Sequence, residues 1–241
     1  MLFLCAIDHS LSPTVLVALR RYYDRLEFYV IDDGIGIFRK IKNELNLPDE
    51  QHAILEIAKG KLTTDPERHS GEGIFFTSRM FDRFSITSGN LYFGSGDARD
   101  WLLESRNEAK GTGVFLGIDT KSPRRLSEVF DAFASEFDNY GFSRTTIPVE
   151  LLQHEGERLV SRSQAKRLLV RIEDFKQVVL DFEGVETVGQ AFADEIFRVF
   201  RMKHPDVHLL PVNMTSATRR MIERALERAE ASQQKLDFQE P

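Results

Sequence analysis

The chain has 241 residues, 41% of them hydrophobic, and this length and apolar content predict two folded domains. Its formal net charge of −6 argues against direct nucleic-acid binding, because a negative surface repels the phosphate backbone. The single cysteine, Cys5, excludes an internal disulfide and indicates a reducing compartment.

The N-terminal segment Met1–Ala6 is apolar, but Asp8 and His9 follow it at once and no basic region precedes it. This pattern argues against a signal peptide and against a transmembrane span. We therefore expect a cytoplasmic protein that makes no contact with a membrane.

The first third of the chain begins with two runs rich in β-branched and aromatic residues. Thr14–Tyr22 and Leu26–Ile31 are separated by a short turn and predict a β-hairpin. Helical spacing follows in Ile37–Leu45, and Asp49 is placed to cap a second helix. The polar stretch Lys59–Gly73 has no periodicity of its own, so we expect a long, mobile loop there.

An apolar helix is expected after this loop, at Ile74–Phe81. Four short strands should follow, near Phe84–Thr87, Asn90–Phe93, Asp100–Ser105 and Thr112–Ile118. A helix from Pro123 then completes a first domain that we place at residues 1–137.

Turn-forming residues at Asp138–Gly141 predict a linker, which we place at residues 138–144. The second domain, residues 145–231, alternates strands and helices, and this order predicts an α/β layer. Its expected elements are strands at Thr145–Leu151, Gln177–Phe182 and Val207–Val212 and helices at Ser163–Val170, Gln190–Phe200 and Ser216–Ala229. Residues 232–241 should form a frayed polar tail.

Three glycine-containing boxes stand in the first domain. They read D-D-G-I-G at Asp32–Gly36, H-S-G-E-G-I-F at His69–Phe75 and G-T-G-V at Gly111–Val114. In this order, over roughly residues 6–118, they resemble the histidine-kinase-like ATPase superfamily (GHKL, Bergerat fold), which includes gyrase and the anti-sigma-factor kinases. The resemblance implies an α+β fold, a two-layer α/β sandwich that binds ATP with Mg²⁺.

The first box supplies the base-binding residues by this resemblance. A carboxylate at a strand end can accept a hydrogen bond from the exocyclic amine of adenine, and Asp32 takes that place. Gly34 and Gly36 lack a Cβ, so the backbone there can approach a flat base. Thr112, in the third box, is expected at the adenine edge. Taken alone, the first box is more typical of an ordinary Asp-Gly turn than of a base-binding site.

The second box is expected to bind the phosphates. Gly71 and Gly73 precede the helix that begins with Ile74, and free N–H groups at a helix start can bind phosphate oxygens. Lys59 and Lys61 either close over the triphosphate or are simply solvated, and the sequence favours neither reading. The remaining nucleotide-binding candidates of this segment are His69, Ser70 and Glu72.

The start of the site departs from the superfamily's pattern. Members begin with a helix that carries Glu-x-x-x-Asn-Ala, and Ala6–Ser10 resembles the end of that box. In this register Met1 stands at the glutamate position and Cys5 at the asparagine position, where neither can act as general base or magnesium ligand. Either the chain is a degenerate binder or its start is truncated, and we favour truncation. We assign no catalytic or metal-binding residue and expect negligible ATP turnover.

The second domain resembles another family. The segments Ser161–Leu168, Val179–Val185 and Gly189–Glu195 are similar to the STAS-like DUF4325 domain, over roughly residues 145–228. Related anti-sigma-factor antagonists carry a phosphorylated serine at a helix start, but the corresponding turn Thr187–Gln190 has no serine. We also expect Arg198 to pair with Asp194 on the polar face of its helix.

The sequence thus predicts an ATP-binding regulatory protein of signal transduction. Binding of the adenine nucleotide would order the loop and change how the STAS-like domain binds an unidentified protein partner. Two alternatives stay open: a protein kinase or ATPase of the anti-sigma-factor type, if an upstream segment supplies the missing Glu and Asn, and a nucleotide-independent scaffold.

Overall fold

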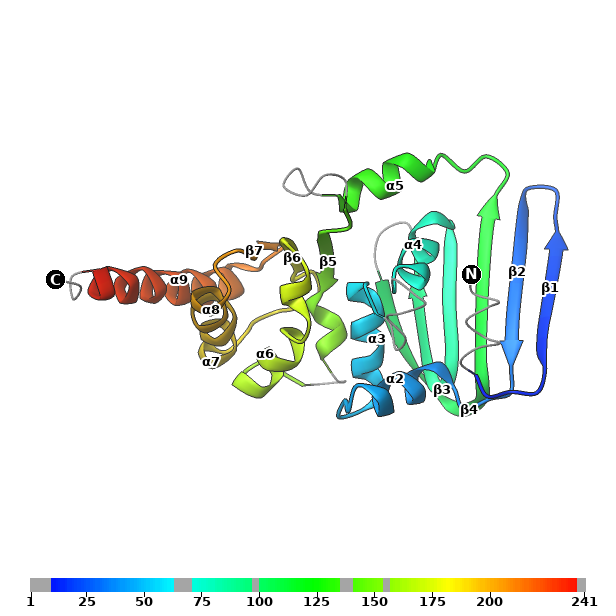
Figure 1. Cartoon of the computed structure of the whole chain (residues 1–241), viewed down its shortest axis with the longest axis horizontal. Helices are drawn as coiled ribbons and strands as arrows, with labels where there is room; N and C mark the ends of the chain where they lie inside the picture. Colours follow the sequence, from blue (N-terminus) through cyan, green and yellow to red (C-terminus); the bar gives the residue numbers. More distant parts are fainter. Residues whose placement is uncertain (1–9, 63–70, 97–99, 135–140, 154–156, 238–241) are drawn as a thin grey trace. The chain divides into compact units, whose positions relative to one another are not determined.

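The computed structural model describes residues 10–62, 71–96, 100–134, 141–153 and 157–237 (Figure 1). The chain divides into two compact units, Met1–Ala132 and Phe133–Pro241, each built from helices and a sheet of its own. The fold class is therefore α+β. Within the described part of the chain, every helix is too short or too polar to cross a membrane.

The first unit contains a four-stranded antiparallel sheet in the order β1-β2-β4-β3. The predicted hairpin is confirmed, because Tyr22 N donates to Arg25 O at 2.8 Å and closes the turn between its two strands. The strands are β1 (Val15–Arg21), β2 (Arg25–Asp32), β3 (Arg83–Ser95) and β4 (Asp100–Asp119).

The strands β3 and β4 are longer than the sequence predicts. The four short strands expected after the second glycine box are two long ones, whose pairing is irregular between Ser88 and Leu91. Gly89 lies in this irregularity with a φ of +60°, a conformation that glycine adopts at no steric cost. The glycine lets the strand continue where its sequence signals a break.

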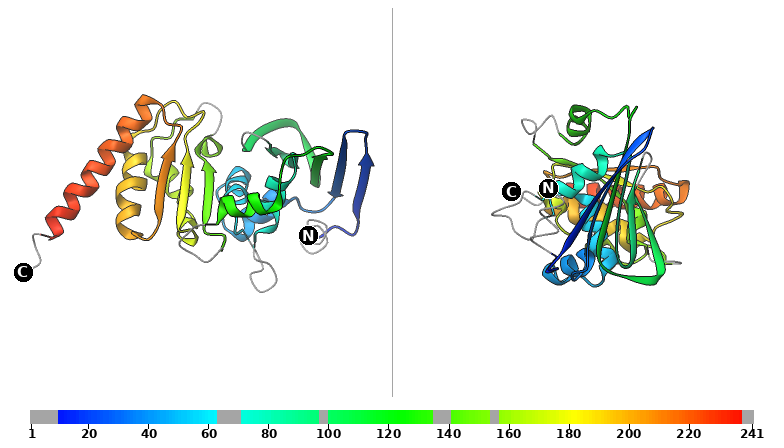
Figure 2. Two further views of the ribbon diagram at one scale, coloured as in Figure 1. Left: turned by 90° about the horizontal axis from the view of Figure 1, so that it is seen from above. Right: turned by 90° about the vertical axis from the view of Figure 1, so that its right-hand side faces the viewer.

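Three helices accompany this sheet, α2 (Ile37–Glu44), α3 (Glu50–Lys59) and α4 (Gly73–Met80). The predicted cap of α3 is confirmed, because Asp49 Oδ1 accepts from His52 N at 3.0 Å. All three helices pack against β3, and α3 packs against both α2 and α4 (Figure 2). The buried face of the sheet carries Val30, Phe84, Ile86, Val114 and Leu116.

The second unit contains a three-stranded parallel sheet in the order β5-β6-β7, as the alternation of strands and helices predicts. Its strands are β5 (Arg144–Pro148), β6 (Gln177–Asp181) and β7 (His208–Val212). β5 ends three residues before the predicted end at Leu151. Pro148 has no N–H to donate to a ladder, and the chain continues as the 3₁₀ helix Val149–Leu152.

The helices of the second unit include one with an unexpected form. The predicted helix from Gln190 is α7 (Gln190–Asp194), then a π-helical stretch, Glu195–Phe200, then α8 (Arg201–Lys203). The others are α6 (Arg162–Leu168), which begins with a capping box of Ser161 and Gln164, the 3₁₀ helix Ile172–Asp174, and α9 (Ser216–Asp237). The predicted tail is wrong for residues 232–237, which continue α9.

The division between the units falls earlier than the predicted linker, of which residues 138–140 lie outside the described part. The division falls at the last residue of α5 (Leu126–Phe133), a helix that begins after Pro123, its predicted start. Ser143 N donates to Phe133 O at 3.3 Å, and the Phe142 ring lies 5.5 Å from that of Phe175. Arg144 already belongs to β5. The described residues 141–144 are therefore part of the second unit.

Candidate functional site

Asp32, the last residue of β2, is a buried carboxylate held by the backbone. Its Oδ1 accepts from Gly34 N at 2.9 Å and from Thr112 N at 3.3 Å. Thr112 is the cross-strand partner of Asp32 on β4, and its hydroxyl accepts from Ile37 N at 3.0 Å. The Oδ2 atom of Asp32 receives no hydrogen bond from the described residues. One carboxylate oxygen is thus used by the fold, and the other remains an acceptor.

The glycines around Asp32 are required by close backbone approaches. A Cβ on Gly34 would overlap the carbonyl oxygen of Ser10, which accepts from Ile35 N at 3.0 Å. Gly36 has a φ of +84° and lies against the hydroxyl of Ser88. The turn after β2 is therefore packed between Ser10, which lies five residues before β1, and Ser88 of β3.

A second carboxylate stands beside Asp32 but faces solvent. Asp33 Oδ1 accepts from the Ser12 hydroxyl, and Asp33 Oδ2 lies 3.2 Å from Lys110 Nζ. The hydrogen bond from Ser12, followed by that from Lys110, holds the pKa of Asp33 below its ordinary value. Asp33 is therefore ionised at neutral pH, with its charge directed to these two partners.

The second glycine box leads into α4. Gly71 has a φ of +74°, and a Cβ there would collide with the backbone carbonyl carbons of Lys61 and Leu62. Lys61 thus lies beside Gly71, and Gly73 and Ile74 are the first residues of α4. Glu72 immediately precedes α4 and is half-buried. His69 and Ser70 lie outside the described residues.

Lys59 is not a loop residue. It is the last residue of α3, its exposed fraction is 0%, and its Nζ lies 2.6 Å from Glu56 Oε1, one turn earlier. The prediction of a hydrated position in the loop is wrong for Lys59, because the helix continues one residue further and buries it. A contact between Lys59 and a phosphate would require this buried ion pair to open.

The structure brings the first and third glycine boxes together, but the described residues of the second box are not hydrogen-bonded to them. Asp32, Gly34, Gly36 and Thr112 form one hydrogen-bonded or contacting group. Between the described residues, no hydrogen bond joins this group to Gly71–Ile74. Ser10 and Ser88 also belong to the first group. Neither is among the predicted site residues: Ser88 stands in no motif, and the Ala6–Ser10 segment gives Ser10 no role at this turn.

The described residues contain no group of three or more His, Cys, Asp or Glu side chains arranged to hold a metal ion. Met1 and Cys5, at the positions where the superfamily has its base and magnesium ligand, lie outside the described residues. Neither a methionine nor a cysteine supplies the oxygen ligand that Mg²⁺ prefers, and we assign no step to a bound metal.

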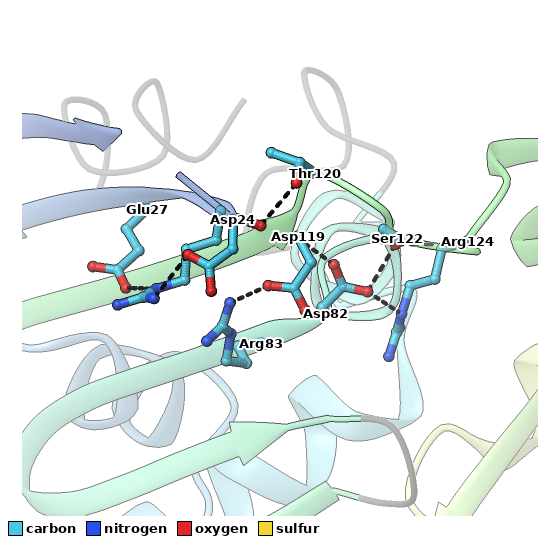
Figure 3. Close-up of polar contacts among 9 residues, drawn as sticks. Asp24, Glu27, Asp82, Arg83, Asp119, Thr120, Ser122 and Arg124 are labelled. Atoms are coloured by element: carbon cyan, nitrogen blue, oxygen red, sulfur yellow. Dashed lines mark hydrogen bonds and ion pairs between the residues drawn. The ribbon is translucent and has the colours of Figure 1, made fainter. Parts of the chain in front are cut away.

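A separate polar cluster lies where β2 and β3 begin and β4 ends (Figure 3). Arg83 pairs with Asp119, and Arg124 Nε lies 3.3 Å from Asp82 Oδ1. Asp82 Oδ2 also accepts from Asp119 N at 2.7 Å, and Thr120 N donates to Asp24 O at 2.8 Å. These bonds tie the β1–β2 turn and the end of β4 together, so the cluster stabilises the sheet.

The second unit carries a charge pair between the buried Asp194 and the half-buried Arg198, on the helix that continues through the π-helical stretch. Arg198 binds both carboxylate oxygens of Asp194, with Nε to Oδ1 at 2.7 Å and a second nitrogen to Oδ2 at 2.6 Å. The predicted pair is thus confirmed, but Asp194 and Glu195 are buried, not on a polar face. The hydrogen bond from Arg198 lowers the pKa of Asp194, and the charges of Arg228 and Arg162 add to this.

The turn before α7 is the position that the resemblance to anti-sigma-factor antagonists assigns to a phosphorylated serine. Val188 pairs with Leu159, and Gly189 N donates to Leu159 O at 2.7 Å. A Cβ on Gly189 would come within 2.7 Å of the Val160 backbone. Thr187 is half-buried, and the tight packing after it fixes the start of α7.

A family model described as a STAS-like domain of unknown function (DUF4325) matches residues 164–219. No curated protein matches the chain. The matched residues run from α6, through β6, α7 and β7, into the first residues of α9. The match supports a STAS-like DUF4325 domain at residues 164–219 of the second unit.

Proposed function

We propose that the first unit binds an adenine nucleotide and that the chain is a nucleotide-responsive regulator. The observation that carries the proposal is the arrangement of Asp32. The backbone N–H groups of Gly34 and Thr112 both donate to its Oδ1 and so orient the buried carboxylate. Its Oδ2 can then accept from the 6-amino group of adenine. An oriented buried acceptor of this kind selects a ligand that brings a donor.

The elements around Asp32 support a histidine-kinase-like domain with a two-layer α/β sandwich. The sheet is antiparallel, three helices pack against one strand of it, and the D-D-G-I-G box follows β2 directly. The G-T-G-V box lies on β4, opposite the end of β2. The register of these two strands therefore brings together the two boxes that the resemblance assigns to the base.

The phosphates would bind at the start of α4. The N–H groups in the first turn of a helix have no partner within the helix and attract anions. Gly71 and Gly73 give access to these groups, and Lys61 adds a positive charge beside them. His69 and Ser70 remain candidates of the same segment by the resemblance alone.

The STAS-like domain would provide the output, by binding a protein partner whose affinity depends on the nucleotide. The proposed function is nucleotide binding without hydrolysis or phosphoryl transfer, because the candidate residues contact the base and the phosphates and none is assigned a catalytic role. The kinase or ATPase alternative needs a Glu and an Asn that this sequence does not contain at the matching positions.

Base selectivity tests this proposal directly. Calorimetric titration should show binding of a non-hydrolysable ATP analogue and at least about ten-fold weaker binding of the GTP analogue, because guanine presents a carbonyl oxygen where adenine has its amine. Equal affinity for the two would contradict the assignment of Asp32. Binding of neither would favour the nucleotide-independent scaffold.

A further inference from the structure

β1 is the edge strand of the first unit and carries exposed apolar side chains on both faces. Val17 and Leu19 are 55% and 62% exposed, and Leu16, on the opposite face, is 59% exposed. Within the described residues β1 pairs with β2 alone, and it is the outermost strand in Figure 1. Exposed apolar edges of this kind are typical sites of association with another strand.

The hairpin turn fixes which backbone groups of β1 face outward. Tyr22 N donates to Arg25 O, and hydrogen-bonded pairs alternate along an antiparallel ladder. The N–H and C=O groups of Leu16, Ala18 and Arg20 therefore point to β2. Those of Val15, Val17, Leu19 and Arg21 point away from the sheet and are available to another strand.

This edge lacks the features that usually prevent strand addition. The register of β1 with β2 runs from Val15 to Arg21 without a bulge, and no proline interrupts it. The charged residues of the strand, Arg20 and Arg21, stand together at its end. The stretch from Val15 to Leu19 is apolar and regular.

We propose that β1 pairs antiparallel with β1 of a second copy of the chain, about a two-fold axis at Ala18, and joins the two four-stranded sheets into one. In this register Val17 lies opposite the partner's Leu19 and exchanges both backbone hydrogen bonds with it. Ala18 lies opposite the partner's Ala18 in a non-hydrogen-bonded pair. The proposal is independent of nucleotide binding.

The sequence of β1 favours a second copy over an unrelated strand. A two-fold axis at Ala18 covers Val17 and Leu19 with the same two side chains of the partner, so the exposed apolar surface is self-complementary. It also separates Arg20 from the partner's Arg20 by four residues, roughly 13 Å, which exceeds the Debye length in physiological salt. The partner's Arg20 and Arg21 lie instead opposite Leu16 and Val15. Val15 pairs with Asp32 of β2, which the exposed carboxylate Asp33 follows.

Sedimentation velocity across a range of concentrations tests the interface. Wild type should show a reversible dimer, and the double variant Val17→Lys/Leu19→Lys should dimerise at least about ten-fold more weakly, since like charges would face each other across the axis. Leu103→Lys is the matched control, because Leu103 is also a strand residue, 59% exposed, but lies on β4. Equal circular dichroism spectra and melting temperatures would show that all three proteins fold.

Cysteine cross-linking tests the register. In a Cys5→Ser background, Ala18→Cys should give a disulfide-linked dimer on mild oxidation, because the Cα atoms of a non-hydrogen-bonded pair lie about 4.5 Å apart, within disulfide range. Leu16→Cys should not cross-link, since its distance from the partner's residue 16 is roughly 13 Å. A wild-type protein that is monomeric at every concentration, or a cross-link at residue 16 in place of 18, would overturn the proposal.

Discussion

Asp32 and Thr112 face each other across β2 and β4, and the Thr112 amide donates to the same carboxylate oxygen, Oδ1, that Gly34 N binds. This relationship positions a buried acceptor that, among the residues the structure describes, is held by backbone amides alone. The fold therefore already contains the restraint that a base-binding carboxylate needs, before any ligand arrives.

Gly111 is expected to be essential to this arrangement. It has a φ of +69°, and a Cβ there would overlap the carbonyl oxygen of Asp32. Gly111→Ala should lower the free energy of unfolding by about 1–3 kcal/mol, through backbone strain and displacement of β2. Gly113→Ala is the control, with no atom within 4 Å of its added Cβ and an expected change within about 0.5 kcal/mol. Urea unfolding followed by the fluorescence of Trp101, the only tryptophan, measures both, and equal losses would contradict the assignment.

The buried pair of Glu56 and Lys59 should be costly to break from one side. Glu56→Ala leaves a buried ammonium without this carboxylate and should lower the free energy of unfolding by about 3–5 kcal/mol. The double replacement Glu56→Met/Lys59→Met should cost less, because it removes both charges. Glu44→Ala, which breaks the more exposed Lys40–Glu44 pair of α2, should cost at most about 1 kcal/mol. If Glu56→Ala lowers the free energy of unfolding no more than the double replacement does, the two charges are not desolvated.

The Asp194–Arg198 pair predicts a pH dependence in the second unit. Because its hydrogen bond with Arg198 lowers the pKa of Asp194, the pair stabilises the fold above the unfolded-state pKa, about 3.9. That contribution is lost as pH falls through the lower pKa of the folded state. Asp194→Asn should therefore be less stable than wild type at pH 7, with a difference that shrinks below about pH 4. Urea unfolding followed by circular dichroism gives the free energy of unfolding of both proteins at each pH. A difference between them that does not change with pH would contradict the predicted role of the Asp194 carboxylate.

The elements that the sequence predicts well are those that depend on neighbouring residues. The turn between Tyr22 and Arg25 and the Asp49 cap are local, and both have the predicted form. The continuity of β3 through Gly89 depends on pairing with β4, and the prediction fails there. It also fails at Lys59, which the polar stretch assigns to the loop but which α3 includes and buries. The π-helical stretch Glu195–Phe200 likewise keeps an apolar spacing that also fits an α-helix.

In the candidate site, too, the sequence predicts the motif residues but not the contacts between distant segments. The D-D-G-I-G and G-T-G-V boxes mark Asp32 and Thr112, but their register across β2 and β4 is visible only in the fold. Ser88, which contacts the turn after β2, belongs to no motif. Ser10 ends the Ala6–Ser10 segment, but that resemblance gives it no role in this turn, so the sequence reveals neither contact.

The variant Asp32→Asn tests whether Asp32 Oδ2 accepts the adenine amine, as we propose. The asparagine Oδ1 can keep both bonds from Gly34 N and Thr112 N, while its Nδ2 replaces the acceptor with a donor. Asp33→Asn is the matched control, the same change on the neighbouring carboxylate, which is exposed and held by Ser12 and Lys110. In calorimetric titration with a non-hydrolysable ATP analogue, Asp32→Asn should bind about ten- to a hundred-fold more weakly than wild type, and Asp33→Asn should bind as wild type does. Wild-type affinity in Asp32→Asn, in a protein of unchanged melting temperature, would contradict the account.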